Sequence, residues 1–451
     1  MARFLISAWP YSGHLHPCLA LAGRLRRRGH EIAFYSGATA SALVAGEGYQ
    51  FFGFAALARY LARLVGLQPD DPAVFQALNE RYTTVGESSL AGAGRRVRAL
   101  LSEMTAGSVA AQLEDLRAIH RDWAPDAIVV DPMMWAPILV WHEQTGMPVI
   151  PFSFYAGALL PGRRVPVAGF GVAPASGWAG RLRNRAINAA AGWMNQSVRQ
   201  SLNLLRRAEG LTPLAASIPA HAARMPLYLV ASSPEFDFQR DDLPSAVTYI
   251  GPCLWEASTT NGAASEPLPA SQPGRPIVYL SEGTAQVGEP FLIRAGVEAL
   301  AGSGVQVVVT TGRHRGQPSL GLPNVPANVH IRQWVSHRDL FARTAVVVTT
   351  GGSGTVRQAL ALGVPVLAVP LEWDQLENAA RLEHCGAGVR LSRRHCTAAS
   401  IRSAVTSLLD NPRYRDQARR IQTSFDKAEQ NDAALERLEA LTPAVAGRFP
   451  C

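Results

Sequence analysis

Short apolar runs alternate with amphipathic stretches along both halves of the chain. Runs rich in β-branched and aromatic residues are typical of buried strands, and a 3.6-residue apolar period is typical of helices. We expect strands in the first half at 4–8, 31–35, 127–130, 148–152, 227–231 and 247–250. In the second half we expect them at 278–280, 305–310, 330–332, 346–349 and 364–369. Strands separated by helices favour two α/β domains with parallel sheets, whose ligands bind at the carboxyl ends of the strands.

The helix expected after the first strand, at 17–29, has a clear buried stripe. Pro17 suits its first position, because that position needs no N–H, and Gly29 ends it. Arg24 should then lie toward solvent. The buried stripe consists of Cys18, Leu21, Ala22 and Leu25. Further helices are expected at 181–207 and, as a charged tail, at 413–441, while 56–120 has the pattern of helices and loops.

A polar, flexible composition divides the chain. Residues 258–276 are rich in Pro, Gly, Ser and Ala and poor in bulky apolar side chains, which is typical of a linker. We therefore expect an N-terminal domain at 1–257, the linker at 258–276, a C-terminal domain at 277–425 and a helical tail at 426–451.

Composition excludes several classes of protein. With 451 residues, 47% hydrophobic and 17% charged, the chain is long and apolar enough for two globular domains. No apolar run reaches the roughly 18 residues of a membrane span, and Pro10 interrupts the N-terminal run, so we expect a cytoplasmic protein. The five cysteines lack metal-ligand spacing. Lys427, the only lysine, lies outside any phosphate-loop motif, and a pyridoxal Schiff base on it is improbable.

The glycine-rich turn at 351–355 carries the strongest chemical signal. A β-branched run ends there and a helical pattern begins, so free N–H groups and a helix dipole meet at one point that suits a diphosphate. Asp374 and Gln375 follow the next strand, where acids and amides can bind sugar hydroxyls. A phosphate site beside a polyol site predicts a nucleotide-sugar ligand.

Two histidines follow the first strand. His14 lies where a neutral imidazole can remove a proton from an acceptor hydroxyl, because its ordinary pKa is near neutrality. Asp131, at the end of another strand of the same sheet, can stabilise the imidazolium that forms. For His16 a structural role is the simpler interpretation.

Two further strand ends can contact a nucleotide. Trp334 follows a strand of the second half, where its indole can stack on a base, as an alternative to core packing. Ser281, Gly283 and Thr284 end another strand and can approach the diphosphate; an ordinary tight turn at Gly283 is the alternative.

These motifs together resemble glycosyltransferase family 1, the nucleotide-sugar-dependent enzymes of small-molecule glycosylation that include the bacterial macrolide-type group. The resemblance rests on 13–17 (Gly-His-Leu-His-Pro), on 351–355, and on Asp374-Gln375 with Glu377-Asn378-Ala379. It extends from residue 3 to about 425 and is weakest at 50–120 and 157–215. It implies a GT-B fold, in which two Rossmann-like parallel-sheet domains face each other across a cleft, an inverting mechanism, and no required metal or other cofactor.

The resemblance also implies roles for residues. His14 would be the general base and Asp131 its partner. The donor-binding residues would be Ser281, Gly283, Thr284, Trp334, Val335, Thr350, Gly352, Ser353, Gly354, Thr355, Gln358, Asp374 and Gln375. An apolar acceptor pocket would be lined by Trp9, Tyr11, Ser12, Met133, Trp135, Phe154 and Tyr155, with core packing as the alternative for each apolar side chain.

Two positions depart from the family pattern. Thr350 stands where the family usually has His, and Gln358 where it often has Glu. These departures leave the donor open between a UDP-sugar and a dTDP-sugar. Arg357 can restore positive charge unless it points away along its helix.

The leading hypothesis is transfer of a sugar to a hydroxyl of a hydrophobic natural product of secondary metabolism. The alternatives are a nucleotide-sugar epimerase, a non-catalytic transferase-like auxiliary protein and, last, a nicotinamide oxidoreductase, since the first turn lacks GxGxxG. We expect no nucleic-acid partner, because the net charge of +8 comes from dispersed arginines. The helix at 181–207 is a candidate for weak peripheral membrane contact or an acceptor-site lid, with an ordinary amphipathic surface helix as the alternative.

Overall fold

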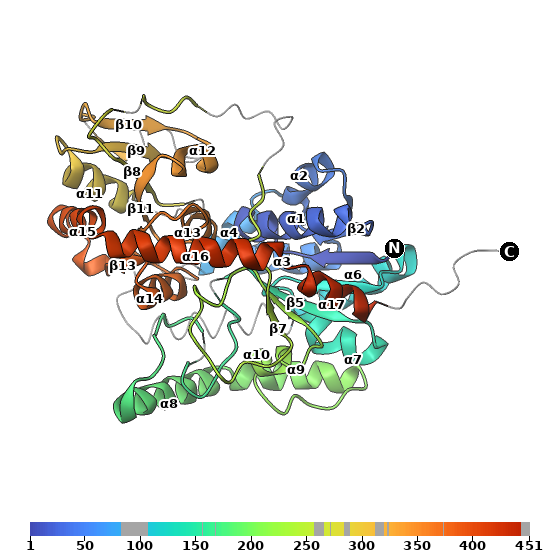
Figure 1. The fold of residues 1–451 in the computed structure, drawn as a ribbon. Helices are drawn as coiled ribbons and strands as arrows, with labels where there is room; N and C mark the ends of the chain where they lie inside the picture. Colours follow the sequence, from blue (N-terminus) through green and yellow to red (C-terminus); the bar gives the residue numbers. More distant parts are fainter. Residues whose placement is uncertain are drawn as a thin grey trace.

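Two parallel sheets organise the chain (Figure 1). The computed structural model describes residues 1–82, 107–155, 157–166, 168–256, 266–270, 272–283, 289–311, 320–322, 324–372 and 374–442. The pairing of every strand in both sheets is parallel. Among the helices of these ranges, none is long and apolar enough to cross a membrane.

The first sheet has the order β3-β2-β1-β4-β5-β6-β7. Its strands are β1 (Arg3–Ser7), β2 (Glu31–Ser36), β3 (Gln50–Gly53), β4 (Ala127–Val130), β5 (Val149–Ser153), β6 (Tyr228–Val230) and β7 (Val247–Tyr249). The helical segments between them are α1 (Ser12–Arg27), η1 (Ala38–Ala40), α2 (Ser41–Gly46), α3 (Ala56–Val65), α4 (Val74–Tyr82), α6 (Ser108–Trp123), η3 (Pro137–Trp141), α7 (His142–Thr145), α8 (Gly177–Met194), α9 (Gln196–Ala208) and α10 (Ile218–Ala222). Both faces are covered, since Leu5 joins a core with α3 and α6 while Phe4 and Ile6 join one with α1.

The second sheet has the order β10-β9-β8-β11-β12-β13. Its strands are β8 (Ile277–Ser281), β9 (Gln306–Thr310), β10 (Val329–Arg332), β11 (Thr344–Thr349), β12 (Val366–Ala368) and β13 (Gly388–Arg390). Its helical segments are α11 (Phe291–Leu300), α12 (His337–Phe341), α13 (Ser353–Ala361), α14 (Gln375–Cys385), η6 (Arg393–His395) and α15 (Ala398–Asp410). Val347 packs into one core and Val346 and Val348 into the other, so the central strand β11 is apolar on both faces.

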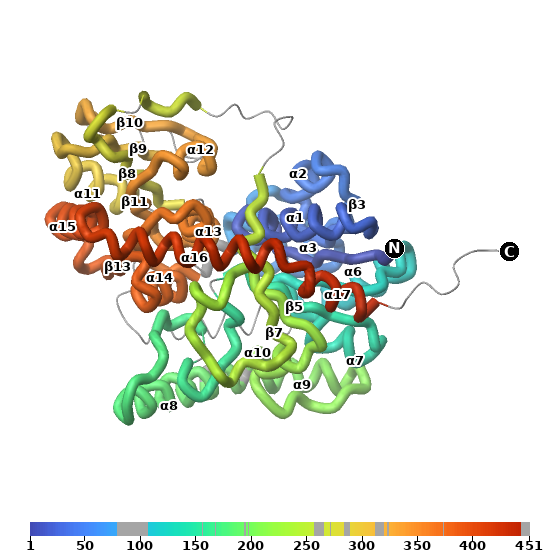
Figure 2. The backbone as a smooth tube through the Cα atoms, viewed as in Figure 1, coloured from blue at the N-terminus to red at the C-terminus, as the bar shows by residue number. Residues whose placement is uncertain are grey.

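The last two helices return to the first sheet (Figures 1 and 2). α16 (Pro412–Gln430) packs on α13 and α15, and α17 (Ala433–Leu441) follows it. Ala434, Leu435 and Leu438 of α17 are buried in the same core as α1. Glu439 accepts from the Arg28 guanidinium at 2.6 Å. The domain boundary expected at residue 426 therefore falls inside α16.

Two expectations about α1 are wrong. The helix begins at Ser12 rather than at Pro17, which lies in its second turn. Pro17 costs one backbone bond close to the helix start, and burial of Leu15 and Pro17 offsets that loss. Arg24 is buried rather than solvent-facing, because it donates to the carbonyl oxygens of Ile250 at 2.7 Å and Glu429 at 3.0 Å.

Candidate functional site

A histidine and a buried aspartate meet at the carboxyl edge of the first sheet. Strands β1 and β4 pair through Ser7 and Val130, so the residues that follow each strand reach the same edge. His14 lies in the first turn of α1, and Asp131 directly follows β4. Their Nδ1 and Oδ2 atoms are 2.7 Å apart, which brings together the two residues expected as base and partner.

The contacts of Asp131 fix the orientation of His14. The Asp131 side chain is fully buried, and it accepts from the backbone N–H of Trp9 at 2.9 Å and of Met133 at 2.7 Å. A carboxylate with these donors accepts a hydrogen bond from the imidazole, so Nδ1 of His14 carries the proton and Nε2 keeps a lone pair. The His14 side chain is 16% exposed and can be reached by a substrate hydroxyl.

Aromatic rings surround His14. Its ring centroid lies 4.9 Å from that of Phe154, 6.1 Å from Tyr11 and 6.3 Å from Tyr155. The expected acceptor residues differ in burial. Trp9 and Phe154 are core side chains, and Ser12 is exposed. The half-buried residues are Tyr11, Met133, Trp135 and Tyr155. The half-buried group is the better placed to contact a ligand.

Tyr155 connects the two halves electrostatically. Burial raises the pKa of its phenol, and the negative charges of Asp131 and Asp374 raise it further. One of these carboxylates belongs to the first sheet and the other to the second. The phenol therefore lies within reach of both edges, next to His14.

The glycine-rich turn after β11 has the geometry of an anion site. Gly351 has a φ of +93°, and Gly352 precedes the first residue of α13, Ser353. The first N–H groups of a helix lack carbonyl partners in a preceding turn. Asp374 Oδ2 accepts from the Ser353 amide at 2.8 Å, which leaves the first-turn amides of Gly354 and Thr355 available to an anion.

Asn378 joins this turn to α14. Its Nδ2 donates to the carbonyl of Gly351 at 2.8 Å and to Asp374 Oδ2 at 3.0 Å. The expected sugar-binding carboxylate is thus held beside the α13 start. Gln375 is placed differently, because its Oε1 accepts from the amide of Leu371 at 2.9 Å and shapes the turn before α14.

The end of β8 lies beside the same turn. Ser281 pairs with Thr349 across the sheet, and its hydroxyl accepts from the Gly283 amide at 3.2 Å. Thr350 is buried and donates its hydroxyl hydrogen to the carbonyl of Glu282 at 3.1 Å. It would have to give up that bond to donate to a diphosphate. Thr284 lies outside the described residues.

The remaining expected donor residues differ in exposure. Trp334 is half-buried, as a stacking residue must be, whereas the Val335 side chain is core and offers only its backbone. Gln358 Oε1 accepts from His337 Nδ1 at 2.6 Å. Burial lowers the pKa of His337, so the ring is neutral and donates its Nδ1 hydrogen to Gln358.

Arg357 points away from the anion site. It is fully buried, donates from Nε to the Ser353 carbonyl at 3.2 Å, and reaches the Pro252 carbonyl in the first half. Burial lowers the pKa of its guanidinium to about 10. It therefore joins the two halves and does not replace the charge missing at Thr350.

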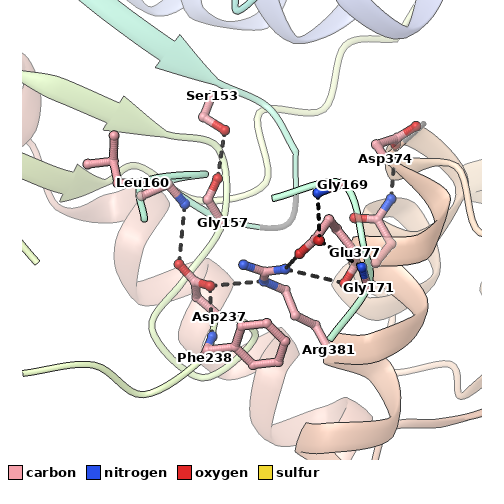
Figure 3. Close-up of polar contacts among 12 residues, drawn as sticks. Ser153, Gly157, Leu160, Gly169, Gly171, Asp237, Phe238, Asp374, Glu377 and Arg381 are labelled. Atoms are coloured by element: carbon pink, nitrogen blue, oxygen red, sulfur yellow. Dashed lines mark hydrogen bonds and ion pairs between the residues drawn. The ribbon is translucent and has the colours of Figure 1, made fainter. Parts of the chain in front are cut away.

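A buried ion-pair chain also joins the two halves (Figure 3). Arg381 of α14 lies between Glu377, at 2.8 Å, and Asp237, at 2.9 Å. Glu377 Oε1 accepts from the amides of Gly169 and Gly171, both at 2.9 Å. The Glu377 of the sequence motif thus binds the loop that follows β5 and does not face the anion site.

Sequence reasoning missed Asp237 and Arg381. Glu377 and Arg381 at i, i+4 on a helix gave a signal for an ion pair. The sequence around these two residues does not indicate that Asp237, from the other half of the chain, forms the second ion pair with Arg381. Among the described residues, no group of three or more His, Cys, Asp or Glu side chains could hold a metal ion.

The chain is similar in sequence to known proteins. Residues 297–440 match the family model for the C-terminal domain of erythromycin biosynthesis protein CIII-like proteins. The chain is 30% identical to 4'-demethylrebeccamycin synthase of Lentzea aerocolonigenes over 98% of its own length and 99% of that protein. It is 35% identical to a PGL/p-HBAD biosynthesis glycosyltransferase of Mycobacterium tuberculosis, over 50% of each chain.

Solved structures share the fold. The glycotransferase of kitacinnamycin superposes with a TM-score of 0.70 at 20% identity, over 98% of this chain and 99% of that one. Spinosyn rhamnosyltransferase in complex with thymidine diphosphate superposes with a TM-score of 0.68 at 19% identity, over 97% of this chain and 100% of that one. The arrangement of two parallel sheets is therefore common to all three.

Proposed function

The chain belongs to glycosyltransferase family 1, in the bacterial macrolide-type group, and on that premise we propose an inverting transfer with His14 as general base. Its fold is GT-B. The relatives are glycosyltransferases that act on natural-product acceptors with nucleotide-sugar donors. The proposal adds the donor class, a UDP- or dTDP-sugar, and the acceptor group, a hydroxyl of a hydrophobic small molecule.

The first half supplies the base and the acceptor pocket. Nε2 of His14 takes the proton of the acceptor hydroxyl as its oxygen attacks the anomeric carbon of the sugar. Asp131, bonded to Nδ1 at 2.7 Å, stabilises the imidazolium that forms. Tyr11, Met133, Trp135 and Tyr155 offer the partly exposed apolar surface on which a hydrophobic acceptor would rest.

The second half supplies the donor site. The bond from the anomeric carbon to the diphosphate breaks as the new bond forms on the opposite face, which inverts the configuration. The amides of Gly354 and Thr355 at the α13 start stabilise the charge that grows on the leaving diphosphate. Trp334 stacks on the base, and the free carboxylate oxygen of Asp374 accepts from a sugar hydroxyl.

The distance between His14 and Asp131 is the observation that carries the proposal. We expect His14→Ala to lower kcat by at least about a hundredfold, because no other group replaces the base. The dissociation constant of the nucleoside diphosphate should stay within about twofold, since His14 belongs to the other half. Steady-state kinetics and calorimetry with UDP and dTDP, without metal, measure both quantities.

His395→Ala is the matched control, because this histidine is exposed on η6 in the second half. It should leave both quantities unchanged. Transfer by His14→Ala at nearly the wild-type rate would overturn the general-base assignment. Calorimetry that detects neither UDP nor dTDP would overturn the donor class instead, and the two failures are distinguishable.

A further inference from the structure

Helix α8 presents its apolar side chains to solvent. Trp178 is 74% exposed, Leu182 59% and Trp193 67%. Together with the exposed Ala189 they follow the spacing i, i+4, i+11, i+15, which places them in one stripe along the helix. The stripe spans about 22 Å at 1.5 Å per residue.

The opposite face of α8, turned toward the protein, carries small and polar residues. Asn184 and Ala191 are buried, and the Asn184 amide donates to the carbonyl of Arg164 at 2.6 Å. Gly180 lies so close to Ala175 that an added Cβ would meet its atoms at 3.2–3.3 Å. An ordinary surface helix has the reverse orientation, with its apolar stripe toward the core.

Arginines flank the stripe. Arg181 and Arg185 are exposed on one side of it, and Arg183 on the other. From residue 144 to residue 208 the sequence contains eight arginines and no aspartate or glutamate. A local excess of positive charge over 65 residues contrasts with the mixed charges of the rest of the chain.

A cavity lies at the N-terminal end of α8. Its volume is about 340 Å³, and it is lined by Arg163, Arg164, Ala175, Gly177, Arg181 and Asp241. Asp241 forms an exposed ion pair with Arg163 at 3.3 Å, so the other two arginines exceed the local negative charge. Guanidinium groups bind phosphate oxygens in pairs, which suits this cavity to a phosphate headgroup.

We propose that α8 is a docking surface for anionic lipid bilayers, lying in the plane of the interface with Trp178, Leu182 and Trp193 inserted among the acyl chains. Exposed tryptophans beside arginines are the composition that favours this interface. The arginine excess gives the charge complementarity to anionic headgroups. Helix α8 follows β5 in the chain, and β5 ends on the acceptor side of the proposed catalytic site, so docking would hold that side close to the bilayer.

Cosedimentation of the full chain with vesicles tests the proposal. Wild-type protein should sediment with equimolar phosphatidylglycerol and phosphatidylcholine, much less with pure phosphatidylcholine, and less again when salt is raised to about 0.5 M. Trp178→Ala with Leu182→Ala should weaken binding by roughly tenfold or more. Arg181→Glu with Arg185→Glu should weaken it by roughly thirtyfold or more.

Arg402→Glu with Arg420→Glu is the matched control, because both arginines are exposed on α15 and α16 and the change in charge is identical. The control should bind as the wild type does. All variants should keep wild-type nucleotide binding and transfer to a water-soluble acceptor, so this test is independent of the proposed mechanism.

Tryptophan fluorescence gives a second readout, which uses a milder substitution in case the alanine variants do not fold. Lipids brominated in the acyl chain quench the fluorescence of tryptophans that are inserted in the bilayer, and Trp178→Phe should lose a large part of that quenching. No sedimentation of wild-type protein with anionic vesicles would overturn the proposal, as would undiminished binding of the α8 variants. A wild-type dimer that Trp178→Ala converts to a monomer would instead assign this face to a second copy of the chain.

Discussion

At the scale of single residues, the chemistry of the site rests on His14 and Asp131, which the ends of two paired strands bring to 2.7 Å. The sequence predicts this contact because each residue follows a strand of one parallel sheet. Thr350, Gln358 and Arg357 were harder to place. Their partners, Glu282, His337 and Pro252, depend on side-chain direction and on long-range packing, which spacing along the chain does not encode.

The role of Asp131 gives a prediction at this scale. Asp131→Asn removes the negative charge that stabilises the imidazolium of His14. It also replaces a carboxylate oxygen, which only accepts, by an amide that can turn its NH2 group toward the Nδ1–H of His14. We expect kcat to fall by about a hundred- to ten-thousandfold, with nucleotide affinity unchanged. If kcat falls by less than tenfold in a variant whose thermal melting curve shows that it is folded, His14 works without this partner.

The hydrogen bond of Thr350 gives a second prediction at the scale of single residues. Because its only hydroxyl hydrogen goes to Glu282, Thr350→Val should lower the free energy of unfolding by about 1 kcal/mol or more. The affinity for UDP or dTDP should change by less than about twofold, since the Thr350 hydroxyl hydrogen already goes to the carbonyl of Glu282. Urea denaturation and calorimetry measure the two effects, and a tenfold loss of affinity would place Thr350 in the donor site.

At the scale of elements, the sequence predicts every strand of the two described sheets except β3 and β13, and it gives bounds for only a few of the helices. β3 and β13 lie at outer edges of their sheets and have few buried residues, so neither carries a clear buried apolar run. The helix expected at 181–207 exists as two, α8 and α9, with the break at Asn195. The buried stripe predicts that α1 exists, but it places the start of the helix five residues too late and does not show that Arg24 is covered by the end of α16.

Helix α14 offers a test of how the two halves are held. Arg381→Met leaves the carboxylates of Glu377 and Asp237 buried without their shared partner. The free energy of unfolding should fall by about 3–5 kcal/mol. Arg402→Met, on the exposed face of α15, should change it by less than about 0.5 kcal/mol. Equal, small effects in the two variants would show that the ion pairs do not stabilise the contact between the halves.

At the scale of the whole molecule, the contact between the halves should respond to acid. His16 of α1 stacks obliquely on Trp255, with ring centroids 4.7 Å apart. Burial lowers the pKa of His16 from 6.5 to about 4, and the positive charge of Arg357 from the second half lowers it further. The unfolded chain therefore binds this proton more readily than the folded protein does.

The sign of the effect follows from that difference. The contribution of neutral His16 is complete above pH 6.5 and is lost as pH falls toward 4, by about 2–3 kcal/mol. Melting temperatures of the wild type should decline across this range, and those of His16→Gln should decline less. The exposed His395→Ala should keep the wild-type slope; equal slopes in all three proteins would exclude His16 as the source.

The position of α17 has a consequence for how the protein is made and recombined. The core beneath α1 includes Ala434, Leu435 and Leu438, so the first half lacks part of its interior until the ribosome has released these residues of α17. Exchanging C-terminal halves between related enzymes also transplants this helix. In such a chimera, the transferred α17 must fit the α1 surface of the N-terminal half that it joins. Otherwise the chimera must keep the last helix that belongs to that N-terminal half.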